Sequence, residues 1–564
     1  MGTQAPDNPP RRCLVPKIPC RSIVACQTVC ADAKAETFES FDPGRGSPTG
    51  QHFQAATDAE VDRAAEAAWE AFGVLRGIEP ERRAALLDAM AERIAALGKD
   101  LFDICSQETG LGTTRVISER ERTTNMSRMF ARFVRDGSWC RACIERGDAA
   151  RTPIPKPDLR RMLRPLGPVA VFGASNFPLA YSTAGGDTAS ALAAGCPVIV
   201  KGHPLHPGTG EIIALAIADA VKAVGLPAGT FSFLHAGGAR ERAVGEQLVK
   251  HPCVRAVGFT GSLAGGTAIE RMGRERESPI PVFSEMGSTN PVFVLPSAVQ
   301  TRGRDIADRL VASATVACGQ MCTCPGLVFA IRDENLELLE RGLVDGMNAV
   351  EPQVMLSPAI QDRYESELER ARSLSGIEQR AGGIGRVIAG GRDDDAKPVR
   401  GHAGLLRTTG ATFLKERQLR EEIFGPATIL VVCANEHEMK RCAAAIIGSL
   451  TGSIFAGPYD AALAGELQEI IELRVGRVIF NGVPTGVEVN SAMVHGGPYP
   501  ATTAPHTTAQ GVMAMERWCR PVCWQNAPEA NLPDELKDAN PLGIDREVDG
   551  VRTKEPLTRE ARAT

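Results

Sequence analysis

The chain has 564 residues, of which 43% are hydrophobic and 23% are charged, a composition typical of globular proteins and a length that requires at least two domains. Its 63 Lys and Arg against 68 Asp and Glu give a formal charge of -5, which excludes the basic surface that nucleic acid or anionic membranes require. No apolar run approaches the ~20 residues that cross a bilayer. These observations are compatible with a substrate that is a small neutral or anionic molecule.

Residues 1–35 differ in composition from the rest of the chain. They are rich in proline and cysteine and have no helical periodicity. A set of basic residues suggests a transit peptide: Arg11, Arg12, Lys17 and Arg21. Asp7, Asp32 and the lack of an amphipathic stripe argue against it. We expect residues 1–35 to lie outside the fold, as a disordered extension or a segment upstream of the native start.

The 16 cysteines are too sparse for a disulfide scaffold and indicate reduced thiols. We therefore expect a cytoplasmic protein, with organellar targeting by residues 1–35 as the alternative.

Two long amphipathic helices are predicted at residues 58–72 and 80–110, where apolar residues recur every three or four positions. A further polar helical stretch comes next. Residues 152–167 are rich in proline and predict an edge ribbon or an interdomain crossing, and residues 152–163 could form an oligomerisation arm.

From residue 168 to 262, short apolar runs alternate with helical patterns. This βαβαβ series predicts a Rossmann-type parallel sheet covered by helices on both faces. Because ligands bind at the carboxyl ends of such strands, we expect four loops to share one rim. They are residues 173–178, 201–208, 235–240 and 259–266.

The second half repeats the strand and helix mixture from residue 281 to the strand VIF at 478–480. The glycine-rich run at 381–395 predicts a surface loop, and the tail after Val522 predicts irregular structure. The fold class is therefore α/β.

Several rim residues could carry chemistry. The turn at 258–266 places Gly261, Ser262 and Gly266 between a strand and a helix, where helix N–H groups can bind phosphate, although a simple tight turn would use the same residues. Lys201 ends a strand on this rim and could reach a ribose or a phosphate. Asn176 could donate to an oxyanion or could only shape its turn.

Glu285 is the sole carboxylate in the apolar run VFSEMGS. Burial of an unpaired acid is costly or raises its pKa, which favours a general base, and the alternative is an ion pair with an arginine.

The stretch GQMCTCPG at 319–326 contains two thiols one residue apart. A metal site formed with Cys318 would lack a fourth ligand and a known spacing, and a disulfide between Cys322 and Cys324 would be strained. A nucleophilic thiolate remains, but the residues alone do not choose between the two thiols.

Together, ASNFP, VIVK, FTGS, SEMG, GQMC and EEIFGP occur in the order that resembles the aldehyde dehydrogenase superfamily, over residues 36–525. The resemblance implies that Cys322 is the nucleophile and that Asn176 binds the oxyanion. It implies that Glu285 activates the hydrolytic water, which favours the free acid over transfer to coenzyme A. Glu422 and Phe424 of EEIFGP would orient the nicotinamide ribose and ring.

One departure from the family concerns the cofactor. Many NAD-dependent relatives have an acid three residues after the strand-end lysine, where this chain has Pro204, preceded by His203. We therefore expect NADP to be preferred, with NAD possible, and Lys201 and Arg240 near the 2′-phosphate. Another departure is Ser175, which replaces the usual aromatic before the asparagine.

The run at 481–511 resembles the branch of the family that oxidises α-ketoglutarate semialdehyde, which implies oxidation of 2,5-dioxopentanoate to 2-oxoglutarate. Another semialdehyde or an aliphatic aldehyde is the alternative substrate. A cysteine hydrolase or thioesterase is the alternative class, but no histidine sits in a motif that suggests a partner for Cys322.

The resemblance also divides the chain and implies a homodimer or homotetramer. We expect a dinucleotide-binding domain at 36–287, a catalytic domain at 288–480, a return segment at 481–525 with substrate-mouth loops and an oligomerisation strand, and a tail at 526–564. No resident metal is expected.

Overall fold

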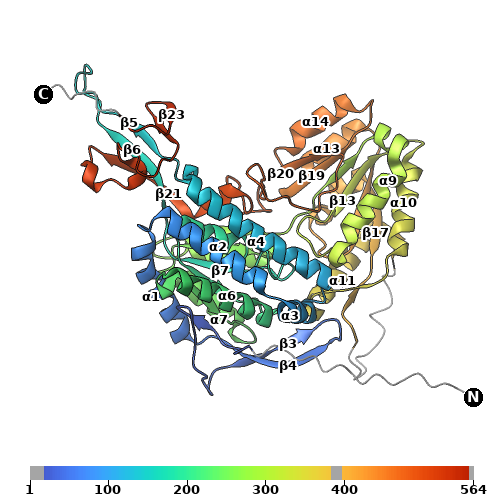
Figure 1. Cartoon of the computed structure of the whole chain (residues 1–564). Helices are drawn as coiled ribbons and strands as arrows, with labels where there is room; N and C mark the ends of the chain where they lie inside the picture. Colours follow the sequence, from blue (N-terminus) through green and yellow to red (C-terminus); the bar gives the residue numbers. More distant parts are fainter. Residues whose placement is uncertain (1–17, 383–396, 558–564) are drawn as a thin grey trace, which may run out of the picture.

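The computed structural model describes residues 18–382 and 397–557. It consists of two α/β domains, each built on one large sheet, and a smaller β arm that projects from the first domain (Figure 1). The α/β class and the Rossmann-type parallel sheet expected from the sequence are confirmed.

The first sheet has seven strands in the order β11-β10-β7-β8-β9-β1-β2, and the strands from β11 to β9 are parallel. These parallel strands are β7 (Val169–Phe172), β8 (Val198–Lys201), β9 (Phe231–Leu234), β10 (Ala256–Thr260) and β11 (Val282–Glu285).

Both faces of this sheet are buried, which explains why its strands are continuously apolar in sequence. On β7, Val169 and Val171 face one core, whereas Ala170 and Phe172 face the other. The helices on the first face are α2 (Pro80–Ala96), α3 (Lys99–Thr109), α4 (Thr113–Asp136), α5 (Gly186–Ala194) and α6 (Pro207–Val224). Those on the second face are α1 (Asp58–Leu75), α7 (Arg240–Lys250) and α8 (Leu263–Arg274).

The expected second helix at 80–110 is two helices, α2 and α3. Leu97 ends α2 in an extended conformation, and Gly98 precedes α3 with φ -100° and ψ -136°. The apolar periodicity continues across the break because both helices pack on the same core. The apolar periodicity therefore identified the buried positions correctly but did not show that the helix breaks between α2 and α3.

The prediction that residues 1–35 lie outside the fold is wrong for residues 18–35. Strands β1 (Ile23–Val24) and β2 (Gln27–Thr28) extend the first sheet, with Ile23 paired antiparallel to Phe233 of β9. Ile23 and Cys26 are buried in the core of this domain. Two-residue strands give no detectable alternation in sequence, which is why the pattern missed them.

The second sheet has the order β15-β17-β18-β13-β12-β19-β20 and is parallel from β17 to β20. Its strands are β12 (Val292–Val294), β13 (Leu327–Ile331), β15 (Glu378–Ala381), β17 (Gly404–Thr409), β18 (Ala427–Cys433), β19 (Ser449–Phe455) and β20 (Val475–Phe480). Helices α9 (Pro296–Thr315) and α10 (Leu336–Ala349) cover one face. Helices α13 (Glu436–Ala445) and α14 (Ala461–Ile471) cover the other.

The arm is a five-stranded sheet in the order β21-β6-β5-β22-β23. Its strands are β5 (Cys143–Glu145), β6 (Leu159–Pro165), β21 (Cys519–Gln525), β22 (Arg546–Val548) and β23 (Val551–Thr553). One expectation is corrected here. The tail after Val522 is ordered rather than irregular, since it supplies β22 and β23, and β21 pairs with β6 of the same chain.

Two short hairpin-like sheets complete the chain. One pairs β3 (Thr37–Asp42) with β4 (Ser47–Gln54), and the other pairs β14 (Gln353–Val354) with β16 (Arg400–Gly401). The predicted glycine-rich loop at 381–395 falls almost entirely outside the described residues. Within the described ranges, no helix combines the length and the apolar character needed to cross a membrane.

Candidate active site

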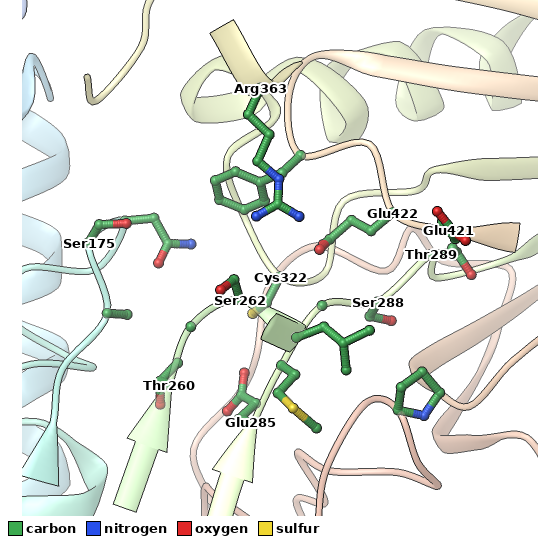
Figure 2. Close-up of a pocket in the computed structure, with 18 of the residues that line it drawn as sticks. Ser175, Thr260, Ser262, Glu285, Ser288, Thr289, Cys322, Arg363, Glu421 and Glu422 are labelled. Atoms are coloured by element: carbon green, nitrogen blue, oxygen red, sulfur yellow. The ribbon is translucent and has the colours of Figure 1, made fainter. Parts of the chain in front are cut away.

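A cleft of about 270 Å³ lies at the carboxyl ends of β7, β10 and β11. Segments of the second domain, including residues around Arg363 of α11 (Pro358–Arg372) and Glu422, close its other side. Figure 2 shows Cys322 near the centre of this cleft, with Glu285 on one side and Glu422 on the other. Two of the four predicted rim loops, at 173–178 and 259–266, therefore form one wall of an interdomain site.

The loop that carries Cys322 follows α9 through an unusual backbone. Ala317, Cys318 and Gly319 have successive φ values of 51°, 56° and 64°, the left-handed region that is costly for residues other than glycine. A Cβ on Gly319 would lie 2.2 Å from the carbonyl carbon of Gly425. Only glycine therefore lets this loop approach the segment that carries Glu422 and Phe424.

Asn290, which the sequence analysis did not single out, hydrogen-bonds to the loop that carries Cys322. Its amide Nδ2 donates to the carbonyl oxygens of Cys322 at 2.8 Å and Cys324 at 2.9 Å. Its Oδ1 accepts hydrogen bonds from the hydroxyls of Ser288 and Thr451. The side chain is fully buried, so this one amide fixes the backbone from the nucleophile candidate to Cys324.

The Cys322 thiol contacts a histidine that the sequence also failed to suggest. The distance from Sγ to Nε2 of His495 is 3.7 Å. The same Nε2 lies 2.8 Å from Oε1 of Glu285, and both side chains are almost completely buried. His495 lies in the run HGGPYP, within the predicted segment of substrate-mouth loops, and 173 residues separate it from Cys322, so no local motif could have paired them.

Electrostatics keep the resting thiol protonated. Burial raises the pKa of Cys322 well above its ordinary value, and the carboxylates of Glu285 and Glu422 raise it further. A base within reach is therefore required to form the thiolate. The carboxylate of Glu285, which lies within 4.8 Å of the sulfur and accepts the Nε2–H of His495, can accept that proton.

Glu285 ends β11 and is buried, as expected from its apolar surroundings. Its partner is His495 and not the arginine considered as an alternative. Its second oxygen, Oε2, is buried and has no hydrogen-bond partner among the described residues. Because Glu285 also lines the cleft, this oxygen is available to a water molecule or to a cation.

Asn176 lines the same cleft from the loop after β7. Its Nδ2 donates to the carbonyl oxygen of Gln320 at 2.9 Å, which ties it to the Cys322 loop. An amide nitrogen carries two hydrogens, so one remains for a ligand. Among the described residues, nothing accepts the backbone N–H of Cys322, which leaves a second donor beside the sulfur.

Cys324 has a different environment from Cys322. Its thiol contacts the carbonyl oxygen of Ser313 at 3.4 Å, and burial raises its pKa to about 12. It does not line the cleft. The tertiary structure therefore separates the two thiols in the way that the family resemblance implies, with Cys322 in the cleft and Cys324 as a packing residue.

The turn after β10 has the expected geometry for phosphate binding. Ser262 caps α8 and accepts the N–H of Gly265, and Gly261 and Ser262 line the cleft. A Cβ on Gly266 would lie 2.5 Å from the sulfur of Met286, so the helix start packs closely on the segment after Glu285. The first turn of α8 points its free N–H groups at the cleft.

Lys201 ends β8 on the same rim and is buried, with Nζ 3.5 Å from Oε1 of Glu241 in α7. His203 and Pro204 follow it in the next turn. Burial lowers the pKa of His203 well below its ordinary value, and His206 and Lys201 lower it further. The His203 ring stacks on that of His206 at 5.2 Å and is therefore neutral.

Arg240 points to α1 and is already paired. Its guanidinium donates to the carbonyl oxygen of Ala56 and to Oδ1 of Asp58. Sequence spacing placed it near the rim, and the structure shows that its charge is shared with this acid. Reaching a 2′-phosphate would require it to exchange these contacts.

Glu422 and Phe424 line the cleft opposite α8. Burial raises the pKa of Glu422 to about 7, although the N–H of Ser288 favours its charged form. A Cβ on Gly287 would lie 2.1 Å from Oε2 of Glu422, so this glycine makes room for the carboxylate. The cleft thus has a positive helix end at one wall and a carboxylate at the other, donors and acceptors that fit the phosphates and ribose of a dinucleotide.

Two arginines lie near Tyr181, and the sequence analysis did not assign them. Arg122 of α4 donates to the hydroxyl of Tyr181 at 3.1 Å, and the Tyr181 ring lies 5.9 Å from that of His495. Arg477 of β20 donates to the carbonyl oxygens of Pro484 and Gly486, in the predicted substrate-mouth segment. Among the described residues, Nε of each is buried without a partner.

This combination of two parallel-sheet domains with a cleft thiol, a buried carboxylate and an amide donor defines a thiol-dependent oxidoreductase of the aldehyde dehydrogenase class. The sequence profile of the aldehyde dehydrogenase family matches residues 30–514. The chain belongs to this family.

Two curated relatives cover nearly the whole chain. The chain is 45% identical to alpha-ketoglutaric semialdehyde dehydrogenase 2 of Azospirillum brasilense over 518 residues, 92% of this chain and 96% of the relative. It is 42% identical to alpha-ketoglutaric semialdehyde dehydrogenase of Acinetobacter baylyi over 523 residues, 93% of this chain and 97% of the relative.

Solved structures share the fold at low identity. Aldehyde dehydrogenase C of Pseudomonas syringae, complexed with NAD⁺ and octanal, superposes with a TM-score of 0.74 at 22% identity, covering 90% of this chain and 97% of that one. Betaine aldehyde dehydrogenase of Staphylococcus aureus, in complex with NAD⁺, gives a TM-score of 0.75 at 20% identity, with 91% and 97% covered. These likenesses confirm the fold expected from the resemblance.

Proposed function

We propose that this aldehyde dehydrogenase oxidises 2,5-dioxopentanoate to 2-oxoglutarate, prefers NADP while accepting NAD, and works through a covalent intermediate on Cys322. The observation that carries the proposal is the convergence of Cys322, Glu285 and Asn176 on one cleft. The names of the two relatives at 45% and 42% identity support the substrate.

Cys322 attacks the aldehyde carbonyl after its proton passes to the carboxylate of Glu285, which lies within 4.8 Å of the sulfur, is held by the N–H of His495, and later releases this proton to solvent. The negative charge that develops on the carbonyl oxygen is stabilised by the free Asn176 amide hydrogen and the Cys322 N–H. Both donors are fixed by the Gln320 and Asn290 contacts. No reorganisation is then needed as charge forms.

When bound, the dinucleotide supplies the hydride acceptor for the oxidation. The α8 terminus at Ser262 and the carboxylate of Glu422 would hold its phosphates and ribose, with Phe424 beside the ring. After oxidation, the acyl group stays on Cys322 as a thioester. Glu285, with its unpaired Oε2, accepts a proton from the water that cleaves this thioester, and the product is the free acid.

Arg122 and Arg477 support an anionic substrate. Arg477 lies within electrostatic range of Cys322 and Tyr181, and Arg122 contacts Tyr181 directly. A carboxylate entering on this side of the sulfur would meet buried guanidinium N–H groups that have no described partner. This arrangement favours a semialdehyde acid over an uncharged aldehyde.

The substrate assignment is tested with an aldehyde panel and NADP. We expect kcat/KM for 2,5-dioxopentanoate to exceed that for butanal and octanal. Arg122→Leu and Arg477→Leu should lower kcat/KM for the charged substrate by about tenfold or more and leave butanal oxidation nearly unchanged. A preference for octanal, or equal losses for charged and neutral aldehydes in both variants, would reject the keto-acid substrate.

Lys201 and the absence of an acid at Pro204 support the NADP preference. The arm and the exposed side chain of Phe480 on the edge strand β20 support a homodimer or homotetramer. Every cysteine in the described ranges is free, which supports a reducing, cytoplasmic location. Light scattering measures the oligomeric state, and cell fractionation measures the location.

The Cys322–His495 contact also favours a second activity, nucleotide-independent hydrolysis of esters or thioesters by the same thiol. The two functions differ in their cofactor requirement. If ester hydrolysis is the main function, removing the nucleotide leaves kcat/KM for p-nitrophenyl acetate high while aldehydes are not oxidised. We expect aldehyde oxidation with NADP to dominate.

A further inference from the structure

Three side chains of different donor chemistry converge at the end of the cleft. They are the thiol of Cys322, the imidazole of His495 and the carboxylate of Glu285, and their ligand atoms all lie within 4.8 Å of one another. The sequence analysis considered a metal only for the cysteines near Cys322. The histidine and the glutamate come from other elements, so this set exists only in the folded chain.

The spacing of these atoms matches tetrahedral coordination. A zinc ion with bonds of ~2.3 Å to sulfur and ~2.0 Å to nitrogen holds these two ligands ~3.6 Å apart. The observed Sγ to Nε2 distance is 3.7 Å. The Glu285 oxygen lies 2.8 Å from the same Nε2, so it would move outward by roughly half an ångström to take a third position.

The surroundings also favour a cation. Cys322 and Glu285 line the 270 Å³ cleft, so an ion can reach them from solvent. Oε2 of Glu285 is buried and has no partner among the described residues. The carboxylates of Glu285 and Glu422 both act electrostatically on Cys322, and together with a thiolate they offset the charge of a divalent ion.

We propose that Cys322, His495 and Glu285 form an inhibitory site for Zn²⁺, open at its fourth position to the cleft. The ion bonds to the thiolate sulfur, and the thiol proton leaves to solvent, so no oxidation or reduction is involved. Sulfur and imidazole ligands select zinc over Mg²⁺ and Ca²⁺. Bound zinc occupies the lone pair that attacks the aldehyde, so metal binding and turnover exclude each other.

The direct test uses Co²⁺ as a spectroscopic substitute for Zn²⁺ on the full chain, reduced with a phosphine and free of nucleotide. We expect a thiolate-to-cobalt charge-transfer band that saturates at one Co²⁺ per chain and disappears when Zn²⁺ is added. The band should be lost in Cys322→Ser and persist in Cys324→Ser, the neighbouring thiol. A band that survives in Cys322→Ser would overturn the proposal.

His495 distinguishes a three-ligand site from a thiol that binds metal alone. In His495→Phe and His495→Gln, the Co²⁺ concentration needed for half-saturation should rise by more than about tenfold, since losing even an outer partner of a metal ligand costs this much. Circular dichroism shows whether each variant is folded. Unchanged cobalt binding in a folded His495 variant would reject a site in which His495 is a ligand.

Activity provides a readout that does not depend on the substrate assignment. Zn²⁺ should inhibit oxidation of every aldehyde that the enzyme accepts, competitively with the aldehyde, and EDTA should restore the rate. Zn²⁺ should also protect Cys322, but not the exposed Cys523, from iodoacetamide, as measured by peptide mass spectrometry. Alkylation of Cys322 at the same rate with saturating Zn²⁺ would contradict the proposal even if the substrate were different.

Discussion

At the scale of single residues, Asn290 determines where the nucleophile lies. Its amide donates to the carbonyl oxygens of Cys322 and Cys324, and its complete burial shields both contacts from water. The residue has φ 45°, in the left-handed region. Asparagine is therefore suited both to the backbone conformation and to the amide contacts.

We predict that Asn290→Gly lowers kcat by about 10²-fold, because misplacing a reacting group by ~1 Å has that effect. Glycine is chosen because it tolerates φ 45°, so the loss isolates the side chain. The matched control is Asn526→Gly, which has φ 51° in the arm, remote from the cleft. Equal activity of the two variants in steady-state assays would show that Asn290 does not position Cys322.

Glu422 predicts a pH dependence of cofactor binding. Burial raises its pKa from 4.5 to about 7, so the carboxylate that we propose as the acceptor of ribose hydroxyls forms only as pH rises through this value. Between pH 6 and 8 we expect the KM for NAD to fall by up to about tenfold. NAD is the better probe because a 2′-phosphate itself titrates near pH ~6.

The variant Glu422→Gln should flatten this profile, whereas Glu421→Gln, which removes an exposed acid paired with Arg370, should keep it. The same raised pKa has a second consequence for the free enzyme. The folded chain holds the Glu422 proton more tightly than the unfolded chain, so this group makes the free energy of unfolding fall as pH rises from about 4.5 to 7. A profile that stays steep in Glu422→Gln would assign it to another group.

At the scale of elements, the position of α7 against the end of β8 bears on the cofactor. Glu241 in the first turn of α7 is 3.5 Å from Lys201. A 2′-phosphate must replace this carboxylate as the partner of Lys201 and would be repelled by it. The family pattern covers only β8 and the turn after it, where Pro204 replaces the usual acid. It therefore does not include Glu241, an acid that α7 brings to Lys201.

We predict that Glu241→Gln raises the ratio of kcat/KM for NADP to that for NAD by about tenfold, since it frees Lys201 and removes a like charge. Glu246→Gln, an exposed acid of the same helix paired with Lys250, is the control. Steady-state kinetics with each nucleotide measure both ratios. A ratio that is unchanged in Glu241→Gln would place the 2′-phosphate away from Lys201.

Elements with strong periodicity were predictable. The apolar strands β7 to β10 and the helix α6 have the predicted type and nearly the predicted bounds, because burial on two faces leaves a long apolar signal. Short elements were not: β1 and β2 contain two residues each. Their place in the sheet depends on the pairing of β1 with β9, which is distant in sequence. Such a pairing produces no pattern in the neighbouring residues.

At the scale of the whole molecule, the arm joins residues from the middle and the end of the chain. Arg160 of β6 is buried and binds Asp158, Asp538 and the carbonyl oxygen of Leu536. It therefore ties β6 to the segment that leads to β22 and β23. The arm projects from the first domain in Figure 1, and these contacts join its middle and C-terminal strands.

We predict that Arg160→Ala loosens residues 526–557 and weakens the proposed oligomer, because removing one partner of a buried ion pair leaves uncompensated charge and costs about 3 kcal/mol. The adjacent Arg161→Ala removes an exposed side chain and should have no effect. Hydrogen exchange reports the loosening, and light scattering reports the mass. Protection of residues 526–557 equal to that of the unchanged chain would contradict this role.

The sequence by itself determined the fold class and the motifs that supply Asn176, Glu285 and Cys322, because periodic burial and contiguous motifs are local properties of a chain. Only the tertiary structure decided which of the predicted residues line one cleft, that His495 contacts both Cys322 and Glu285, that Asn290 anchors the loop, and that the tail belongs to the arm. Each of these depends on contacts between residues distant in sequence, and such contacts form only when the sheets and domains have packed.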